Sequence, residues 1–134
     1  MSHREAEALC SSEGARLAVP RSEKSNNVIH QLVKAQLEIH SIGNLLVRIG
    51  IDDRKHEGDW LSSDGSKLTY SNWADGEPND QGNEDCGTIA RDTGLWHDFS
   101  CDTNEPFICQ KTTSNCGNCG CDEGPVFAYF FMNH

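Results

Sequence analysis

Carboxylate and amide side chains dominate Glu77-Pro78-Asn79-Asp80, and further ones follow in Glu84-Asp85-Cys86 and Trp96-His97-Asp98. Calcium is a hard cation that takes about six to eight oxygen ligands from carboxylates, amide carbonyls and the backbone. The proline between Glu77 and Asn79 favours both side chains pointing the same way, most readily if the Glu77–Pro78 bond is cis. These segments therefore predict a calcium site with the ligands Glu77, Asn79, Glu84 and Asp98.

A second set of acidic residues predicts another calcium beside the first. Its members are Asp53, Glu57, Asp80 and Asp85. A solvated acidic loop would explain any one of these carboxylates. The whole set, however, lies among tryptophans and is flanked by cysteines, which favours an ordered metal site.

Charge is distributed unevenly along the 134 residues, whose formal net charge is −10. Residues 52–105 contain fourteen acidic and four basic residues and so hold the whole imbalance. Phosphates would be repelled from such a segment, which argues against nucleic acid as a partner. Trp60, Trp73 and Trp96 lie in the same segment and argue against a disordered acidic tail. Bound metal is the simplest remaining reason for this density of acids.

The seven cysteines are more than a cytosolic protein of this length usually carries, unless it binds zinc or does redox chemistry. The first four, Cys10, Cys86, Cys101 and Cys109, are widely spaced and form no paired Cys-x-x-Cys knuckles. Disulfides in a secreted domain fit this pattern better. Residues 1–5 lack the apolar segment of a signal peptide, so we expect a piece of a longer secreted protein or a chain whose signal has been removed. No apolar run approaches the roughly 18 residues that a membrane span needs.

Two helices are predicted in the first part of the chain. Ser2-x-x-Glu5 is typical of a capping box and predicts a helix to about Glu13, which Gly14 ends with a positive φ. Ser22 is the expected N-cap of the second helix. Apolar residues recur there at helical spacing and are expected to pack in the core: Val28, Ile29, Leu32, Val33 and Leu37.

Short strands are predicted for the rest, at residues 45–51, 86–90, 95–96 and 107–110, with a turn at 92–94. Residues 52–83 show little periodicity, and loops of that length inside a compact domain are usually functional or disordered. The sequence therefore predicts an α+β fold, in which two helices and small antiparallel sheets carry a long calcium-binding loop region.

Composition changes at residue 112, so we expect one domain over residues 1–111 and a separate tail over residues 112–134. The tail contains Cys116, Cys119 and Cys121, and this odd number leaves one cysteine unpaired. An intermolecular disulfide through that cysteine would make a homo-oligomer. Four of the chain's ten aromatic residues lie in residues 126–132.

The acidic loop, its tryptophans and its cysteine spacing resemble the C-type lectin domain, in a form close to the mannose-binding type. The resemblance covers about residues 2–111. Residues 5–10 and 14–18 look like the family's first helix and its exit, and residues 68–73 precede the E-P-N loop as in the family. Arg48-Ile49-Gly50-Ile51 is similar to the W-I-G-L core strand, with Arg48 in place of the usual tryptophan. E-P-N alone would be a weak motif, but E-P-N with W-x-D and matching cysteines is specific.

The resemblance implies the disulfides Cys10–Cys109 and Cys86–Cys101. It implies a primary calcium held by Glu77, Asn79, Glu84, position 97 and Asp98. It also implies an auxiliary calcium held by Asp53, Glu57, Asp80 and Asp85. In such lectins two vicinal sugar hydroxyls complete the primary calcium's coordination shell.

The implied function is calcium-dependent binding of mannose, N-acetylglucosamine or fucose-type sugars on glycans or glycoproteins. The sugar-binding residues would be Glu77, Asn79, Glu84, His97 and Asp98. The family's galactose type usually has Q-P-D in place of E-P-N. No bond is made or broken, so the chain is not expected to be an enzyme, and a secreted location is expected.

His97 departs from the family, which usually has asparagine at this position. An imidazole offers no oxygen, and calcium prefers oxygen ligands. We therefore hypothesise weaker calcium binding with added pH dependence around neutrality. The alternative is that His97 turns outward and water fills the coordination position.

The sequence also begins at the first helix, whereas the family normally has a strand there that pairs with the last strand. Residues 107–110 would then have an unpaired edge. One hypothesis is that residues 126–132 fold back antiparallel and pair with that edge. The alternative is a truncated or misjoined product with a disordered tail.

Two rival functions remain. A lectin-like module that binds a protein or lipid surface without sugar recognition is favoured by His97 and by the missing first strand. It is opposed by the intact ligand set of Glu77, Asn79, Glu84 and Asp98. An enzyme could use Glu77 and Glu84 as paired glycosidase carboxylates, or a Cys–His nucleophile. Both enzymatic readings are disfavoured, because the carboxylates lie among metal-ligand types and the cysteines match disulfide positions.

Overall fold

A computed structural model describes residues 2–43, 45–78, 84–112 and 126–132, of which residues 112 and 126–132 are described by their backbone alone. Its two helices are α1 (His3–Ser12) and α2 (Glu23–Ile39). Ser2 and Glu5 form the predicted capping box of α1, and Ser22 caps α2. Gly14 follows α1 with a φ of +72°, as predicted. In the part of the chain that is described, no helix combines the length and apolar character of a membrane span.

One face of α2 packs in the core, although not with all of the residues predicted for it. Ile29, Val33 and Leu37 are fully buried, whereas Val28 is 47% exposed and its prediction as a core residue is wrong. Asn26 is buried on this helix instead and is hydrogen-bonded on both ends of its amide. Spacing marked the apolar face to within one residue, and it gave no signal for a buried amide.

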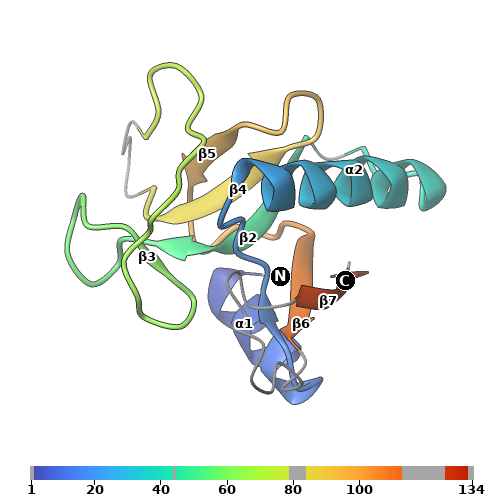
Figure 1. Ribbon diagram of the computed structural model, residues 1–134, viewed down its shortest axis with the longest axis horizontal. Coiled ribbons are helices and arrows are strands. Elements are labelled where there is room, and N and C mark those ends of the chain that lie inside the picture. The colour runs from blue at the N-terminus through green and yellow to red at the C-terminus, as the bar shows by residue number, and fades with distance from the viewer. Residues whose placement is uncertain (1, 44, 79–83, 113–125, 133–134) are drawn as a thin grey trace.

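The strands are β1 (Arg16–Leu17), β2 (Leu46–Asp52), β3 (Leu61–Ser62), β4 (Cys86–Ala90), β5 (Trp96–Phe99), β6 (Phe107–Thr112) and β7 (Val126–Met132). They form one seven-stranded sheet in the order β1-β6-β2-β4-β5, with β3 paired to β2 and β7 paired to β6. All pairs are antiparallel except β2 with β6, which meet where Arg48 lies opposite Phe107. The two-residue strands β1 and β3 are additions to the predicted elements. Figure 1 shows α1 and β6 at one end of the molecule and the long segment between β3 and β4 away from them.

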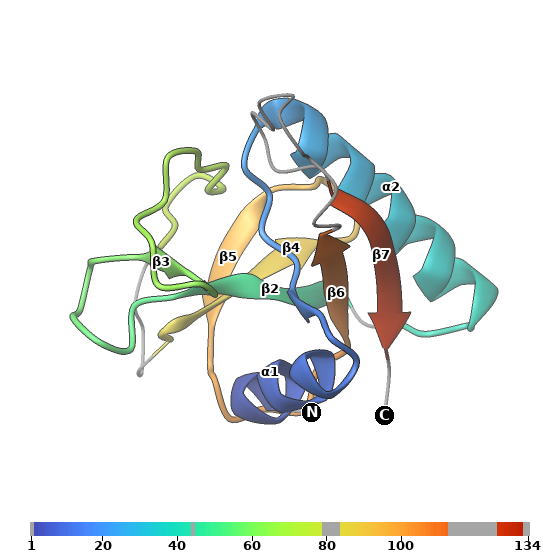
Figure 2. The same ribbon diagram turned by 60° about the horizontal axis from the view of Figure 1, so that its bottom comes forward.

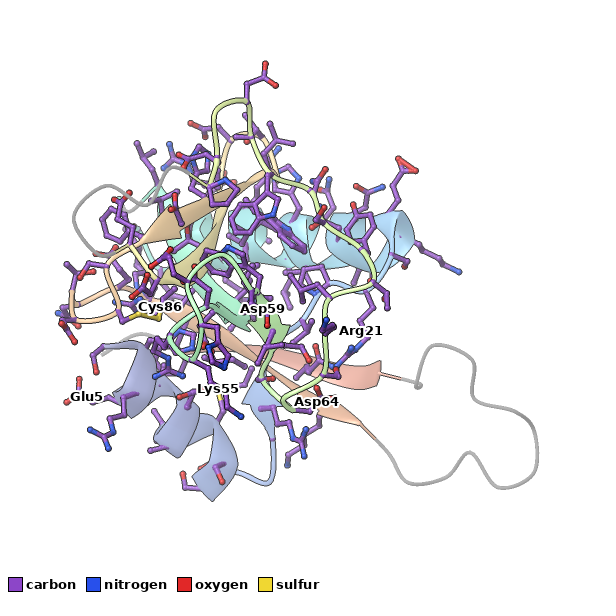
Figure 3. All side chains as sticks on the ribbon, turned by 90° about the vertical axis from the view of Figure 1, so that its left-hand side faces the viewer. Glu5, Arg21, Lys55, Asp59, Asp64 and Cys86 are labelled. Atoms are coloured by element: carbon purple, nitrogen blue, oxygen red, sulfur yellow. A yellow bond between two sulfur atoms is a disulfide. The ribbon has the colours of Figure 1, made fainter. Side chains whose placement is uncertain are left out.

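Two disulfides connect these elements as the family resemblance implied. Cys10 of α1 is bonded to Cys109 of β6, and Cys86 at the start of β4 is bonded to Cys101 after β5. The first bond lies in a small buried cluster with Ala6, Leu17 and Phe107. The second joins the start of β4 to the segment after β5 (Figure 3), so it lies between Glu84 and Asp85 before β4 and Asp98 within β5, which are predicted calcium ligands.

Arg48 is fully buried at the position where the family usually has tryptophan. Its Nη1 donates to the Ser100 carbonyl at 3.0 Å, and its Nη2 donates to the carbonyl and hydroxyl of Thr103. Burial lowers the pKa of Arg48 to about 10, against the opposing charges of Glu105 and Asp102, so the guanidinium stays charged at neutral pH. This side chain fixes the segment after β5 from inside the sheet.

The segment after residue 125 returns to the sheet. β7 pairs antiparallel with β6, from Phe107 opposite Met132 to Thr112 opposite Val126. This pairing confirms the hypothesis that residues 126–132 fold back on the last strand. Figure 2 shows β7 lying beside β6 and next to α2, so β6 has neighbours on both of its long edges.

Replacing Arg48 with methionine is expected to lower the free energy of unfolding by about 2 kcal/mol or more, because two carbonyls lose a charged buried donor. The measurement is chemical denaturation followed by tryptophan fluorescence. Arg16→Met is the matched control, since Arg16 is exposed in β1 and its loss should cost within about 0.5 kcal/mol. Equal effects of the two substitutions would show that the Arg48 hydrogen bonds contribute nothing.

Phe130→Pro is expected to lower the unfolding midpoint by about 5 °C or more, since proline removes a donor from the β6–β7 ladder opposite Cys109. A chain ending at Thr112 should show a similar loss, whereas a chain ending at Met132 should match the parent. The measurement is thermal unfolding by circular dichroism. Unchanged midpoints in both the proline variant and the shorter chain would rule out a stabilising β7.

Candidate functional site

The long segment between β3 and β4 is anchored to the sheet by aromatic packing. Trp96 is fully buried in β5, and the rings of Trp73 and Tyr70 meet it edge-on with centroids 5.5 and 5.8 Å away. Trp60 packs in the same way on Trp73 at 4.8 Å. Backbone hydrogen bonds join Trp96 to residues 72 and 74 on either side of Trp73. Trp60 and residues 70–74 of the predicted long loop are therefore held in a packed arrangement over β5.

A small hydrogen-bond network holds the turn that precedes β5, and its side chains are Asn26, Asn72 and Trp96. The Trp96 indole donates to the Asn26 amide oxygen at 2.8 Å, and Asn26 donates onward to the Gly94 carbonyl at 3.0 Å. Asn72 donates to the same carbonyl at 2.9 Å. Sequence reasoning missed Asn26 and Asn72 because the partner of each lies more than twenty residues away along the chain.

Glu77 lies against β5, next to the predicted site residues His97 and Asp98. The Glu77–Pro78 bond is cis, as the sequence analysis favoured, and the Glu77 amide donates to the Ala74 carbonyl at 2.9 Å. Nδ1 of His97 is 3.1 Å from Oε2 of Glu77. His97 therefore contacts Glu77, while 31% of the His97 side chain stays exposed to solvent.

The carboxyl group of Asp98 is the second neighbour of Glu77. Burial and the hydrogen bond with Asp98 raise the pKa of Glu77, and His97 acts in the opposite direction. Asp98 itself is almost fully buried. Two carboxyl groups held this close disfavour each other's ionised form unless a cation or a proton lies between them. The pair therefore suits a divalent cation.

The remaining members of the primary set are placed less completely. Glu84 is half-buried two residues before β4, and Asn79 lies outside the described residues. Among the residues whose placement is described, the primary set does not form a cluster of three ligand atoms within 4.8 Å. The structure thus brings together Glu77, His97 and Asp98.

Three members of the auxiliary set do form such a cluster. Asp53, Glu57 and Asp85 each offer an oxygen within 4.8 Å of the others, and Asp80 lies outside the described residues. The backbone supports this arrangement, since the Asp53 amide donates to the Asp85 carbonyl at 2.9 Å.

Asp53 provides a test of whether these residues fit a cation. One of its oxygens accepts from the Gly58 amide at 2.8 Å. The other, Oδ1, is buried and has no hydrogen-bond partner among the described residues. An ionised oxygen is costly to bury in that state, and a bound calcium would satisfy it. The three carboxylates are the ligand type that calcium takes, so the cluster fits this ion. The sequence analysis missed the Gly58 contact.

Comparison with known proteins identifies the family independently. The protein family described as Lectin C-type domain matches residues 1–111 of this chain. A mannose-binding protein of Gallus gallus is 39% identical over 101 residues, which are 75% of this chain and 36% of that protein. The chain therefore spans about a third of the length of that relative.

Solved structures show the same fold. The carbohydrate-recognition domain of a mouse scavenger receptor C-type lectin superimposes with a TM-score of 0.68 at 30% identity, covering 81% of this chain and 78% of that one. A calcium-independent type II antifreeze protein superimposes with a TM-score of 0.64 at 28% identity, covering 81% of this chain and 77% of that one. The family match over residues 1–111, the shared fold and the two disulfides all agree. The chain therefore belongs to the C-type lectin domain family, a carbohydrate-binding family without enzymatic activity.

Proposed function

We propose that the chain binds mannose-type sugars in a calcium-dependent manner. The observation that carries the proposal is the meeting of Glu77 with His97 and Asp98, because residues twenty or more positions apart converge at one acidic point of the surface. The mannose-binding relative supports the sugar class. N-acetylglucosamine and fucose-type sugars present the same kind of vicinal hydroxyls and belong to the same proposal.

Each proposed site residue has a distinct role. Glu77, Asn79, Glu84 and Asp98 would hold the primary calcium, which supplies coordination positions for two vicinal sugar hydroxyls. The Glu77 and Glu84 carboxylates accept hydrogen bonds from those hydroxyls, and the Asn79 amide donates one. His97 can donate to a sugar hydroxyl or to Glu77.

The auxiliary set has a supporting role in this proposal. A calcium held by Asp53, Glu57, Asp80 and Asp85 would neutralise the carboxylates at both ends of the loop. Asp85 immediately precedes Cys86, whose disulfide fixes the start of β4. Removing calcium should therefore loosen the loop as well as abolish sugar binding. Glycans or glycoproteins outside the cell are the proposed partners.

A second candidate is a lectin-like module that binds a protein or another surface without a sugar. The specific observation in its favour is the contact of His97 with Oε2 of Glu77, an oxygen that the primary calcium would need. The fold is also similar to that of an antifreeze protein described as calcium-independent. This similarity supports the second candidate, because that protein has a similar fold and no calcium requirement.

Sugar binding is tested by retention on immobilised mannose. The chain is expected to be retained in millimolar calcium and released by a chelator or by free mannose. Glu77→Gln combined with Asn79→Asp should move retention from mannose to galactose, because it recreates the galactose pattern. Asp75→Asn is the matched control: Asp75 is exposed two residues before Glu77 and belongs to neither ligand set.

Retention on mannose that survives the chelator would contradict calcium dependence. A folded chain that binds neither sugar would favour the second candidate.

Substituting His97 with asparagine is expected to tighten calcium binding by several-fold, because an amide oxygen replaces a ring that contacts Glu77 and offers no oxygen. Calcium titration followed by isothermal calorimetry measures the change. His40→Asn is the control, since His40 caps the far end of α2. Unchanged calcium affinity in His97→Asn would show that the ring does not weaken the site.

A further inference from the structure

His3 is a buried histidine whose ring forms no hydrogen bond with the described residues. It lies in the first turn of α1 with no exposed surface. Neither Nδ1 nor Nε2 has a hydrogen-bond partner among the described residues. Buried polar groups are almost always hydrogen-bonded, because their desolvation is otherwise uncompensated. The ring therefore calls for a partner that the described residues do not provide.

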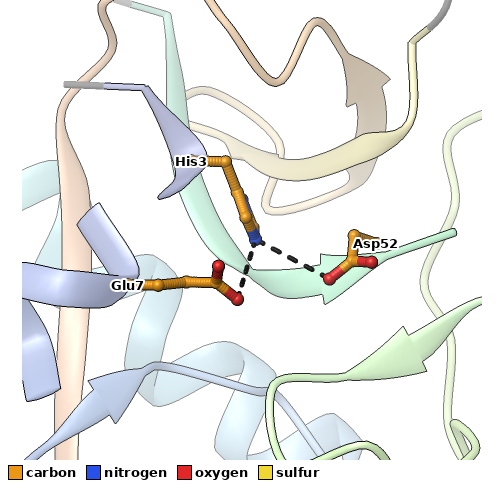
Figure 4. Close-up of side chains that lie close together, drawn as sticks. All are labelled: His3, Glu7 and Asp52. Atoms are coloured by element: carbon orange, nitrogen blue, oxygen red, sulfur yellow. Dashed lines mark ion pairs between the residues drawn. The ribbon is translucent and has the colours of Figure 1, made fainter. Parts of the chain in front are cut away.

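Two carboxylates face the same edge of this ring. Figure 4 shows Nε2 of His3 directed between Glu7 of α1 and Asp52 at the end of β2. Nε2 is 3.6 Å from Oε2 of Glu7 and 3.8 Å from Oδ2 of Asp52. Both distances are too long for hydrogen bonds. His3 and Glu7 are four residues apart on one helix, so they lie on the same face by construction.

We propose that His3, Glu7 and Asp52 form a site for a borderline transition-metal ion, of which Zn²⁺ is the representative. The three ligand atoms lie within 4.8 Å of one another. Ligands about 2.0–2.2 Å from a tetrahedral Zn²⁺ are about 3.3–3.6 Å apart, so small side-chain shifts would close the site. One imidazole and two carboxylates are a ligand set for zinc, whereas calcium avoids nitrogen.

The surroundings provide access and a fourth ligand. A surface pocket of about 440 Å³ is lined by Glu7 and Asp52 together with residues 54, 55 and 61–63 and Gly65. Solvent can therefore reach the carboxylate side of the site, and water can occupy the open position that three protein ligands leave. The site is separate from both proposed calcium sites in its ligands, although Asp52 is the neighbour of Asp53.

Arg54 is the competitor of the metal at this site. Its Nη2 is 3.2 Å from Oδ2 of Asp52 and 3.2 Å from Oε1 of Glu7. The guanidinium thus neutralises the same two carboxylates that the metal would bind. Its side chain is 38% exposed, so it can turn into solvent when a cation enters. Removing Arg54 should strengthen metal binding, which a purely structural ion pair would not predict.

Zinc titration tests the proposal in the full chain. The background variant carries serine at Cys116, Cys119 and Cys121, because tail thiols bind zinc by themselves. Saturating calcium is present throughout to occupy the calcium sites. Isothermal calorimetry with zinc chloride should show one ion per chain, and cobalt substitution should give the visible absorption of a tetrahedral centre.

The variants separate this site from the others. His3→Gln and Glu7→Gln should each weaken zinc binding by about tenfold or more, since even outer-shell partners of a metal are worth about 10–100-fold. Arg54→Gln should tighten it several-fold. Asp75→Asn should leave it unchanged, because Asp75 is exposed and belongs to none of the proposed ligand sets.

The result that would overturn the site is a background variant that binds no zinc, or one whose zinc affinity survives Glu7→Gln and does not rise in Arg54→Gln. Glu7 is partly exposed, so this pair of variants decides the matter even if His3→Gln does not fold. The outcome is independent of sugar binding.

Discussion

The packing of Trp96 is the interaction on which the functional half of the molecule depends. Its ring is part of the hydrophobic core, and its indole nitrogen donates a hydrogen bond to Asn26 of α2. Tyr70 and Trp73 from the long segment pack edge-on against the same ring. A segment with so few apolar residues cannot bury enough surface to order itself. Its residues 70–74 are held in place because Tyr70 and Trp73 pack on Trp96 of β5, which is itself hydrogen-bonded to Asn26 of α2. The adjacent residues 97 and 98 then meet Glu77 as a direct result of where Trp96 is fixed.

The fold could be predicted wherever the sequence pattern is local. Capping residues located the starts of both helices, short apolar runs located β2, β4 and β6, and the family resemblance implied both disulfides. Long-range polar contacts could not be predicted. Arg48 is a charged residue at a core position, and its hydrogen bonds to residues 100 and 103 show how it is accommodated there. Val28 was misassigned because helical spacing defines a stripe and does not say where the stripe's edge meets solvent.

The candidate site, like the fold, could be predicted from the sequence only in part. The candidate ligand types could be identified from the sequence, and Asp53, Glu57 and Asp85 of the predicted auxiliary set lie close together in the structure. The direction of the His97 side chain could not be predicted, because it depends on where Glu77 is held in space. The burial of His3 could not be predicted either, since Asp52, one of the two carboxylates beside it, lies on a strand far along the chain. Acidic residues that look alike in composition thus belong to separate arrangements.

The position of β6 in the sheet sets the order of events during synthesis. β1, β2 and β7 all pair with it, and Cys109 within it is the partner of Cys10, which is 99 residues earlier. The α1 end of the core therefore has no partner until nearly the whole domain has left the ribosome. Cys86 and Cys101 are only 15 residues apart and can meet sooner. Contacts of such long sequence separation make folding slow. The newly made N-terminal half, with Cys10 still a free thiol, consequently needs protection from wrong disulfides until the last strands arrive.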